Sequence, residues 1–290
     1  MEINGEEVNE IVRYDELKLS PEIMRALEKK GYVQATPVQG GAIPYFMEWR
    51  DVIAKAPTGT GKTFAFGIPM VEHIDPREDA VQGLVLAPTR ELAIQIMAEL
   101  RDLCEFKEGV RAVVLYGGQP IDKQITQLKK RPQIVVATPG RLMDHMKRRT
   151  VRLDRVQTVV LDEADRMLDM GFIHDVTRIL DAIKSRKNLG MFSATISREV
   201  MDIACLLEAG SYERAIAFCN TKNMTDRLSG LLKMRGFSAE AIHGDIQQSV
   251  REKTLNRFRR GELRVLVATD VAARGLDIDD VDVVFNYDVP

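Results

Sequence analysis

The 290-residue sequence is poor in the residues that mark extracellular or metal-bound proteins. Its three cysteines, Cys104, Cys205 and Cys219, form no C-x-x-C pair and lie near no histidine cluster, so we expect reduced thiols and no zinc site. No apolar run approaches the roughly 18 residues that cross a membrane. The acidic start, MEINGEEVNE, is also unlike a signal peptide. These absences predict a cytoplasmic protein.

A strong charge of one sign is also absent, because the formal net charge is only −2. This value excludes a protein coated with positive charge for bulk nucleic-acid binding. Residues 141–155 and 251–264 nevertheless each hold six bases against two acids. These two stretches are either patches that follow a phosphate backbone or solvated helix faces.

Length and apolar patterning predict two α/β domains, each with a mostly parallel sheet and helices on both faces. Short apolar runs recur along the chain with helical patterns after them, which is typical of strands covered on both sides. Ser20 and Pro21 predict the start of a first helix. We place the domains at residues 1–204 and 205–290. The apolar runs that we interpret as strands are 51–56, 83–87, 111–116, 133–138, 158–162, 189–194, 215–220, 239–243, 264–269 and 281–286.

A glycine-rich loop, APTGTGKT, follows the first of the long apolar runs. Glycines at this place let backbone N–H groups converge on phosphate oxygens, and Lys62 adds a positive charge while Thr63 offers a hydroxyl to Mg²⁺. The general pattern has glycine where this chain has Ala56. We therefore predict a nucleotide-binding loop that comprises Ala56, Thr58, Gly59, Thr60, Gly61, Lys62 and Thr63.

Three carboxylates crowd the stretch VVLDEADRML at residues 159–168. Such crowding also fits a helix N-terminus, where acidic side chains complement the dipole. With a phosphate-binding loop upstream, the stretch instead predicts a catalytic pair. Asp162 would complete the Mg²⁺ shell through water. Glu163 would deprotonate the attacking water beside Lys62. Asp165 would transmit changes at this site to other segments of the chain.

The order of these and further motifs from Tyr14 to Pro290 resembles the DEAD-box RNA helicases of superfamily 2, with a compact core of the bacterial type. The resemblance implies two RecA-like domains, the second incomplete as printed, and ATP-dependent RNA unwinding with ATP and Mg²⁺ as cofactors. GYVQATPVQ is similar to the family's adenine-reading motif. It implies that Thr36 and Gln39 address adenine and that Tyr14 stacks on the ring, with Gly275 and Asp277 facing the nucleotide from the second domain.

The same resemblance implies contacts to the RNA backbone with little sequence preference, and a segment that couples hydrolysis to strand separation. The coupling residues would be Asp165, Ser193 and Thr195. The implied RNA-binding residues are Pro88, Thr89, Arg90, Gly118, Thr138, Pro139, Gly140, Arg141, His243, Gly244, Arg251, Thr269 and Asp270.

Two family elements are absent from the printed residues. The chain ends at Pro290, before the arginine-rich motif, and only a short segment separates Thr195 from Ala215. We expect a join near residues 204–205. An arginine finger is worth roughly 10³–10⁵ in rate. A nucleotide-dependent RNA clamp without turnover is therefore the alternative function. A DNA translocase of the wider superfamily is a third, which Gln39 and the aspartate at position 165 disfavour.

Overall fold

The computed structural model describes residues 2–3, 6–7, 11–194, 207, 212–269, 272 and 281–287. The chain divides into two compact units, Met1–Thr195 and Ile196–Pro290, and each is described by itself. The predicted boundary and join at residues 204–205 lie outside the described residues, so both stay predictions.

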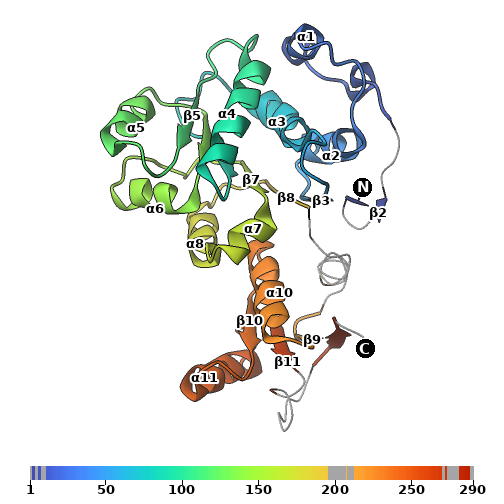
Figure 1. Cartoon of the computed structure of the whole chain (residues 1–290), viewed down its shortest axis with the longest axis vertical. Coiled ribbons are helices and arrows are strands. Elements are labelled where there is room, and N and C mark those ends of the chain that lie inside the picture. The colour runs from blue at the N-terminus through green and yellow to red at the C-terminus, as the bar shows by residue number, and fades with distance from the viewer. Residues whose placement is uncertain are drawn as a thin grey trace. The chain divides into compact units, whose positions relative to one another are not determined.

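The N-terminal unit is built on an eight-stranded sheet with the order β2-β1-β3-β8-β7-β4-β6-β5 (Figure 1). The strands from β3 to β5 in this order all run parallel, whereas β1 pairs antiparallel with β2 and β3. The strands are β1 (Glu2–Ile3), β2 (Glu6–Glu7), β3 (Val52–Lys55), β4 (Gly83–Leu86), β5 (Ala112–Leu115), β6 (Ile134–Ala137), β7 (Thr158–Asp162) and β8 (Asn188–Ser193).

Helices flank this sheet and connect its parallel strands, as the apolar runs predicted. The first begins where the sequence indicated, because the Ser20 hydroxyl accepts a hydrogen bond from the Ile23 N–H. The helices are α1 (Pro21–Lys29), α2 (Pro37–Met47), α3 (Lys62–His73), α4 (Arg90–Cys104), α5 (Ile121–Leu128), α6 (Pro139–Lys147), α7 (Ala164–Asp169) and α8 (Ile173–Ala182), and a 3₁₀ turn spans Tyr14–Leu17.

The core of this unit lies on both sides of the central strands. Every residue of β4, β6, β7 and β8 is buried, which explains why these strands read as continuous apolar runs rather than alternating ones. Among the described residues, no helix is long and apolar enough to cross a membrane.

The C-terminal unit repeats the architecture on a smaller scale. Its four strands are all parallel, in the order β10-β11-β9-β12. Its described elements are β9 (Ala215–Cys219), α10 (Lys222–Met234), β10 (Ala239–Ile242), α11 (Gln248–Arg259), β11 (Val265–Thr269) and β12 (Val283–Asn286). The α/β prediction with mostly parallel sheets is therefore confirmed.

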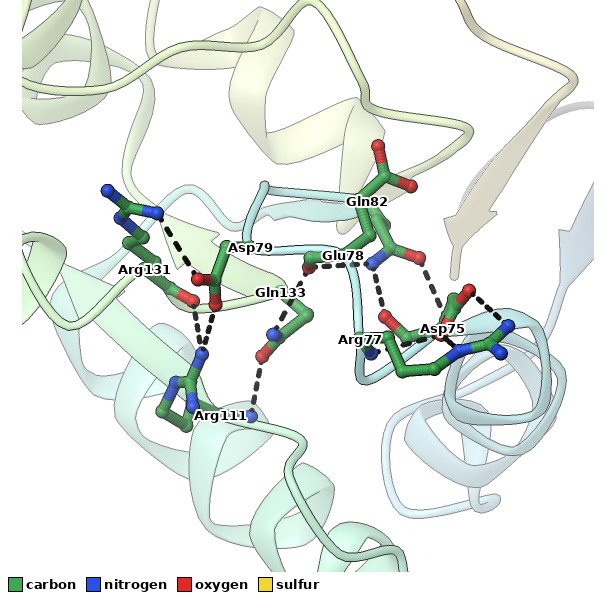
Figure 2. Close-up of polar contacts among 8 residues, drawn as sticks. All are labelled: Asp75, Arg77, Glu78, Asp79, Gln82, Arg111, Arg131 and Gln133. Atoms are coloured by element: carbon green, nitrogen blue, oxygen red, sulfur yellow. Dashed lines mark hydrogen bonds and ion pairs between the residues drawn. The ribbon is translucent and has the colours of Figure 1, made fainter.

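Two buried glutamines tie the loops together at the amino ends of the strands in the N-terminal unit (Figure 2). The Gln82 amide donates to the carbonyl of Asp75 at 2.8 Å and accepts from the Asp75 N–H at 2.9 Å. Gln133 accepts from the Arg111 N–H at 2.9 Å and donates to the Glu78 carbonyl at 3.3 Å. Both glutamine amides are thus satisfied within the unit, and the opposite edge of the sheet carries the candidate site.

Candidate nucleotide and RNA site

The glycine-rich loop joins β3 to α3 at the carboxyl edge of the sheet. Gly59 and Gly61 adopt φ values of +82° and +85°, which L side chains rarely take, so the loop's shape requires glycine at both positions. Ala56 is buried and donates its N–H to the Ser193 carbonyl at 2.9 Å, which anchors the loop to β8. Thr58 and Thr60 complete the loop, and the Thr60 hydroxyl donates to the Pro57 carbonyl at 2.8 Å.

Lys62 is a buried cation that faces this loop without a hydrogen-bond acceptor. Its side chain is 7% exposed, and its Nζ has no hydrogen-bond partner among the described residues. The nearest carboxylate oxygen, Oδ1 of Asp162, lies 3.9 Å away. A buried ammonium group that has one distant carboxylate and no hydrogen-bond partner is costly, so the site is chemically suited to an anionic ligand such as a phosphate chain.

Asp162 and Glu163 lie at the end of β7, beside Lys62. Burial raises the pKa of Asp162 to about 6, against the lowering effects of Lys62 and of the hydrogen bond from the Glu163 N–H. Glu163 has a φ of +50°, a strained conformation for a residue other than glycine, and such strain clusters at functional sites. Its Oε2 accepts from Arg166 at 3.2 Å.

This donor set fits a magnesium ion that is shared with phosphates. Mg²⁺ binds oxygen ligands, keeps several waters and needs only one or two protein groups when phosphates are present. Thr63 and Asp162 are both buried at the cavity and supply a hydroxyl and a carboxylate. A cation there would compensate the desolvated carboxylate.

Thr36 and Gln39 are brought onto the backbone of the glycine-rich loop. The Thr36 hydroxyl donates to the Thr60 carbonyl at 2.8 Å, and Gln39 Nε2 donates to the Gly61 carbonyl at 3.1 Å. Gln39 Oε1 accepts from the Thr36 N–H at 2.8 Å, which closes a capping box at the start of α2. Both residues therefore hold the loop that surrounds Lys62.

Tyr14, which the sequence predicts to stack on adenine, borders the cavity but is largely buried. It is 2% exposed, and its hydroxyl donates to Gln39 Oε1 at 2.6 Å, so its ring is mostly covered by the protein. The accessible aromatic residue at this cavity is Tyr32, which is 45% exposed and packs edge-on against Phe64 at 5.5 Å between ring centroids. Sequence reasoning missed Tyr32, although it is the second residue of GYVQATPVQ; spacing alone does not reveal which tyrosine is buried.

These residues line one cavity of about 480 Å³, a size typical of small-molecule sites. The cavity joins the residues of the glycine-rich loop to the adenine-reading motif and to the catalytic pair. Its lining includes Tyr14, Tyr32, Thr36, Gln39, Thr58, Gly59, Thr60, Gly61, Lys62, Thr63, Asp162 and Glu163.

The predicted RNA-binding residues of the N-terminal unit follow three neighbouring strands, β4, β6 and β5. The Arg90 guanidinium lies 5.0 Å from the centre of the Tyr116 ring, and a Cβ at Gly118 would be 3.7 Å from Arg90 Nη1. Arg141 Nη1 donates to the Gln119 carbonyl at 2.9 Å. The other predicted residues lie at the starts of the neighbouring helices α4 and α6. Thr89 and Thr138 are the N-caps of these helices, Pro88 and Pro139 are buried, and Gly140 is half-buried. The structure thus brings these residues to one edge of the sheet.

Of the corresponding residues in the C-terminal unit, His243 and Gly244 follow β10, Thr269 ends β11, and Arg251 lies on α11. His243 Nε2 is 3.1 Å from Asp226 Oδ1, and the Thr269 hydroxyl accepts from the Ala272 N–H at 3.4 Å. Arg251 donates to the Ala272 carbonyl, so it links α11 to the segment after β11. Gly244 follows His243 and lies near Lys222, which pairs with Asp245.

Asp165 and Ser193 are both buried, on α7 and at the end of β8 respectively. Because β7 and β8 are neighbours, the two residues lie on adjacent connections of the same sheet edge. Thr195, Asp270, Gly275 and Asp277, which the sequence assigned to coupling, RNA and nucleotide, lie outside the described residues.

Two protein-family models match the chain. The DEAD/DEAH box helicase model matches residues 36–203, and the helicase conserved C-terminal domain model matches residues 198–290. The chain is 44% identical to the DEAD-box ATP-dependent RNA helicase CshA of Geobacillus kaustophilus, over 96% of this chain and 68% of the relative. It is 43% identical to the ATP-dependent RNA helicase CshA of Listeria monocytogenes, over 97% of this chain and 61% of the relative.

Solved structures agree with these matches. A DEAD box protein from Methanococcus jannaschii is 37% identical, with a TM-score of 0.61 over 96% of this chain and 85% of that protein. The yeast DEAD-box splicing factor Prp28 is 28% identical, with a TM-score of 0.62 over 99% of this chain and 77% of that protein. The alignment with the Geobacillus relative spans 316 positions, more than this chain has residues, so the relative has aligned positions without a counterpart here.

Proposed function

Because the chain belongs to the DEAD/DEAH box helicase family, we propose that it is an ATP-dependent RNA helicase. It would couple ATP hydrolysis to the local separation of RNA strands. The chain spans 68% of the Geobacillus relative and 61% of the Listeria relative, and the activity of a whole protein is therefore proposed from this part.

One observation carries the proposal: Lys62 and Gln39 line the same cavity. The buried Nζ of Lys62, which has no hydrogen-bond partner within the described part of the chain, would receive the β- and γ-phosphates. Gln39 Oε1 already accepts from Thr36 and Tyr14, but Nε2 has a second N–H beyond its bond to the Gly61 carbonyl, and this N–H could donate to an acceptor on the edge of adenine. Tyr32 offers the accessible ring face for stacking on the base.

Thr63 and Asp162 would hold Mg²⁺ through water, and the bound ion would neutralise charge on the phosphate oxygens. Glu163 would orient the attacking water and accept its proton. RNA would lie against Arg90 and Arg141 through its phosphates. Binding through the backbone predicts little preference for sequence and a preference for RNA over DNA through the 2′-hydroxyl groups.

Replacement of the proposed base tests the catalytic assignment. Glu163→Gln keeps the shape of the side chain but removes its basicity, so ATP affinity should stay while RNA-stimulated phosphate release falls by about 10²–10⁴-fold. Asp169→Asn is the matched control, because Asp169 is an exposed acid on the same short helix. Hydrolysis by Glu163→Gln at the parent rate would refute the role of Glu163.

The same assay on the unaltered chain separates the proposed helicase from the alternative clamp. RNA-stimulated phosphate release that stops when Mg²⁺ is removed by chelation supports the helicase. An ATP analogue that raises RNA affinity in a chain without phosphate release supports the clamp. Hydrolysis stimulated by DNA as strongly as by RNA would favour the translocase. The cytoplasmic location stays a prediction from the sequence.

A further inference from the structure

A buried polar network lies directly behind the predicted RNA-contacting surface of the N-terminal unit. Its centre is His145 on α6, which is 0% exposed. His145 follows Arg141 by four positions, so the two side chains lie on the same side of the helix. Arg141 is half-buried and reaches the carboxyl edge, whereas His145 lies in the interior.

Gln124 on α5 connects these two residues. Its Oε1 lies 3.0 Å from His145 Nε2 and accepts from Arg141 Nη1 at 3.3 Å. Its Nε2 donates to the Tyr116 carbonyl at 2.9 Å and to Gln119 Oε1 at 2.9 Å. Because these two donations fix the amide, the Gln124 oxygen must face both the imidazole and the guanidinium.

The hydrogen bonds assign the tautomer of His145. Nε2 faces the oxygen of Gln124, which can only accept, so Nε2 carries the proton. Nδ1 lies 2.8 Å from the Thr150 hydroxyl, which can donate to it. Burial lowers the pKa of His145, and the nearby Arg141 lowers it further, so the neutral ring is favoured. The neutral ring of His145 thus donates its Nε2–H to Gln124 from the interior of the unit.

The network leaves part of Arg141 available. Within the described residues, its side chain donates hydrogen bonds through Nη1 alone, to the Gln119 carbonyl and to Gln124. One nitrogen of the fork is therefore fixed by the protein, while Nε and Nη2 can address a phosphate. Orientation of a guanidinium before binding reduces the entropy lost when it meets its ligand.

We propose that His145 is a positioning residue for RNA: through Gln124 it holds Arg141 in the orientation that binds a backbone phosphate. The inference rests on the proposed function, because it takes RNA as the ligand of Arg141. It extends that function to a fully buried residue that touches no RNA. The same glutamine also holds the turn at Tyr116 and Gln119, so one amide aligns two of the segments that would follow the RNA backbone.

Two substitutions at position 145 separate the proposed role from simple packing. His145→Leu fills similar space but removes the donor to Gln124, and His145→Gln restores an amide N–H near the position of Nε2. The measurement is the equilibrium Kd for a short single-stranded RNA in the presence of Mg²⁺ and a non-hydrolysable ATP analogue, at several salt concentrations. We expect His145→Leu to raise Kd by about five- to tenfold and to reduce the salt slope by about 1, as the loss of one phosphate contact does. His145→Gln should stay within about twofold of the parent chain.

A double-mutant cycle with Arg141→Ala supplies the decisive readout. Arg141→Ala should raise Kd by about tenfold, and addition of His145→Leu should then have no further effect, because His145 acts only through Arg141. Additive effects of the two substitutions would assign His145 a purely structural role and overturn the inference.

Two further controls keep the outcomes distinct. Thermal unfolding of each variant checks the fold, and His145→Asn, which is too short to reach Gln124, replaces His145→Leu if the latter has no cooperative transition. An unchanged Kd in the substituted chain overturns the role of His145 alone. Absence of any RNA binding by the unaltered chain overturns the proposed function instead.

Discussion

Gly61→Ala tests how the adenine-reading motif holds the phosphate-binding loop. Gly61 has a φ of +85°, and a Cβ there would lie 3.2 Å from Gln39 Cδ and closer still to Nε2. The substitution therefore strains the backbone and also displaces the Gln39 amide from the Gly61 carbonyl. Gly59 provides the matched control, because its φ is +82° but a Cβ there meets nothing within 4 Å.

The expected costs differ between the two glycines. A residue with a side chain in the left-handed region costs about 1–2 kcal/mol at either position. Gly61→Ala additionally breaks the 3.1 Å hydrogen bond from buried Gln39, which adds about 1–3 kcal/mol because the amide loses a partner. We therefore expect a free energy of unfolding lower by about 1–2 kcal/mol for Gly59→Ala and by about 2–5 kcal/mol for Gly61→Ala.

Urea unfolding without nucleotide measures this difference. Trp49 is the only tryptophan of the chain and lies in the N-terminal unit, stacked on His73 at 3.7 Å between ring centroids. Its fluorescence therefore reports on the unit that contains both glycines. Discrimination between ATP and GTP should also weaken in Gly61→Ala and not in Gly59→Ala, because only the former displaces Gln39. Equal losses of stability and equal discrimination in the two variants would refute the coupling between Gln39 and the loop.

The remaining predictions concern the two tyrosines of the cavity and the opposite edge of the sheet. Tyr32→Ala should weaken ATP binding by about tenfold, as expected for a lost ring stack of roughly 1–1.5 kcal/mol, with little change in stability. Tyr14→Phe should instead lower the free energy of unfolding by about 1 kcal/mol through the lost hydrogen bond to Gln39. ATP titrations and urea unfolding of both variants check this division. A larger loss of ATP affinity in Tyr14→Phe than in Tyr32→Ala would identify Tyr14 as the stacking residue. Gln133→Leu should lower the free energy of unfolding by about 1–3 kcal/mol, because the Arg111 N–H loses its buried acceptor, while ATP affinity stays at the parent value. A large loss of ATP affinity in a folded variant would contradict the separation of the amino edge of the sheet from the carboxyl edge.

Most of the fold could be predicted because its strands are uniformly buried. Runs such as those at 83–87 and 158–162 are apolar at every position, and a fully covered parallel strand is the simplest structure that requires this. The two-residue strands β1 and β2 were missed, since so short a pairing leaves no periodicity to detect. The place of β1 beside β3, with β2 outside it, is set by tertiary contacts, which the sequence does not display.

The site was predictable where a residue type is required by its backbone or its chemistry. Gly59, Gly61 and Lys62 belong to this class, because positive φ angles and phosphate charge restrict the choice of residue. Stacking by Tyr14 stays a prediction, because a tyrosine of given spacing can either stack on a ligand or pack in the core, and its 2% exposure favours the core. Gln124 and His145 gave no signal at all, since an isolated polar residue on a helix is most often exposed.

The two edges of the N-terminal sheet differ in how completely they use their own polar groups. At the amino edge, the buried amides of Gln82 and Gln133 bond to loop backbone, and the buried atoms there that lack a hydrogen-bond partner among the described residues, Thr158 Oγ1 and Asn188 Oδ1, are neutral. At the carboxyl edge, Lys62 keeps a buried ammonium group without an acceptor among the described residues, and Asp162 keeps a carboxylate whose pKa is raised by burial. Folding alone would favour replacement of both by apolar side chains. Their position in a cavity of about 480 Å³ fits the proposed ligand, because a phosphate chain would bind the ammonium group of Lys62 and a divalent cation would bind the carboxylate of Asp162.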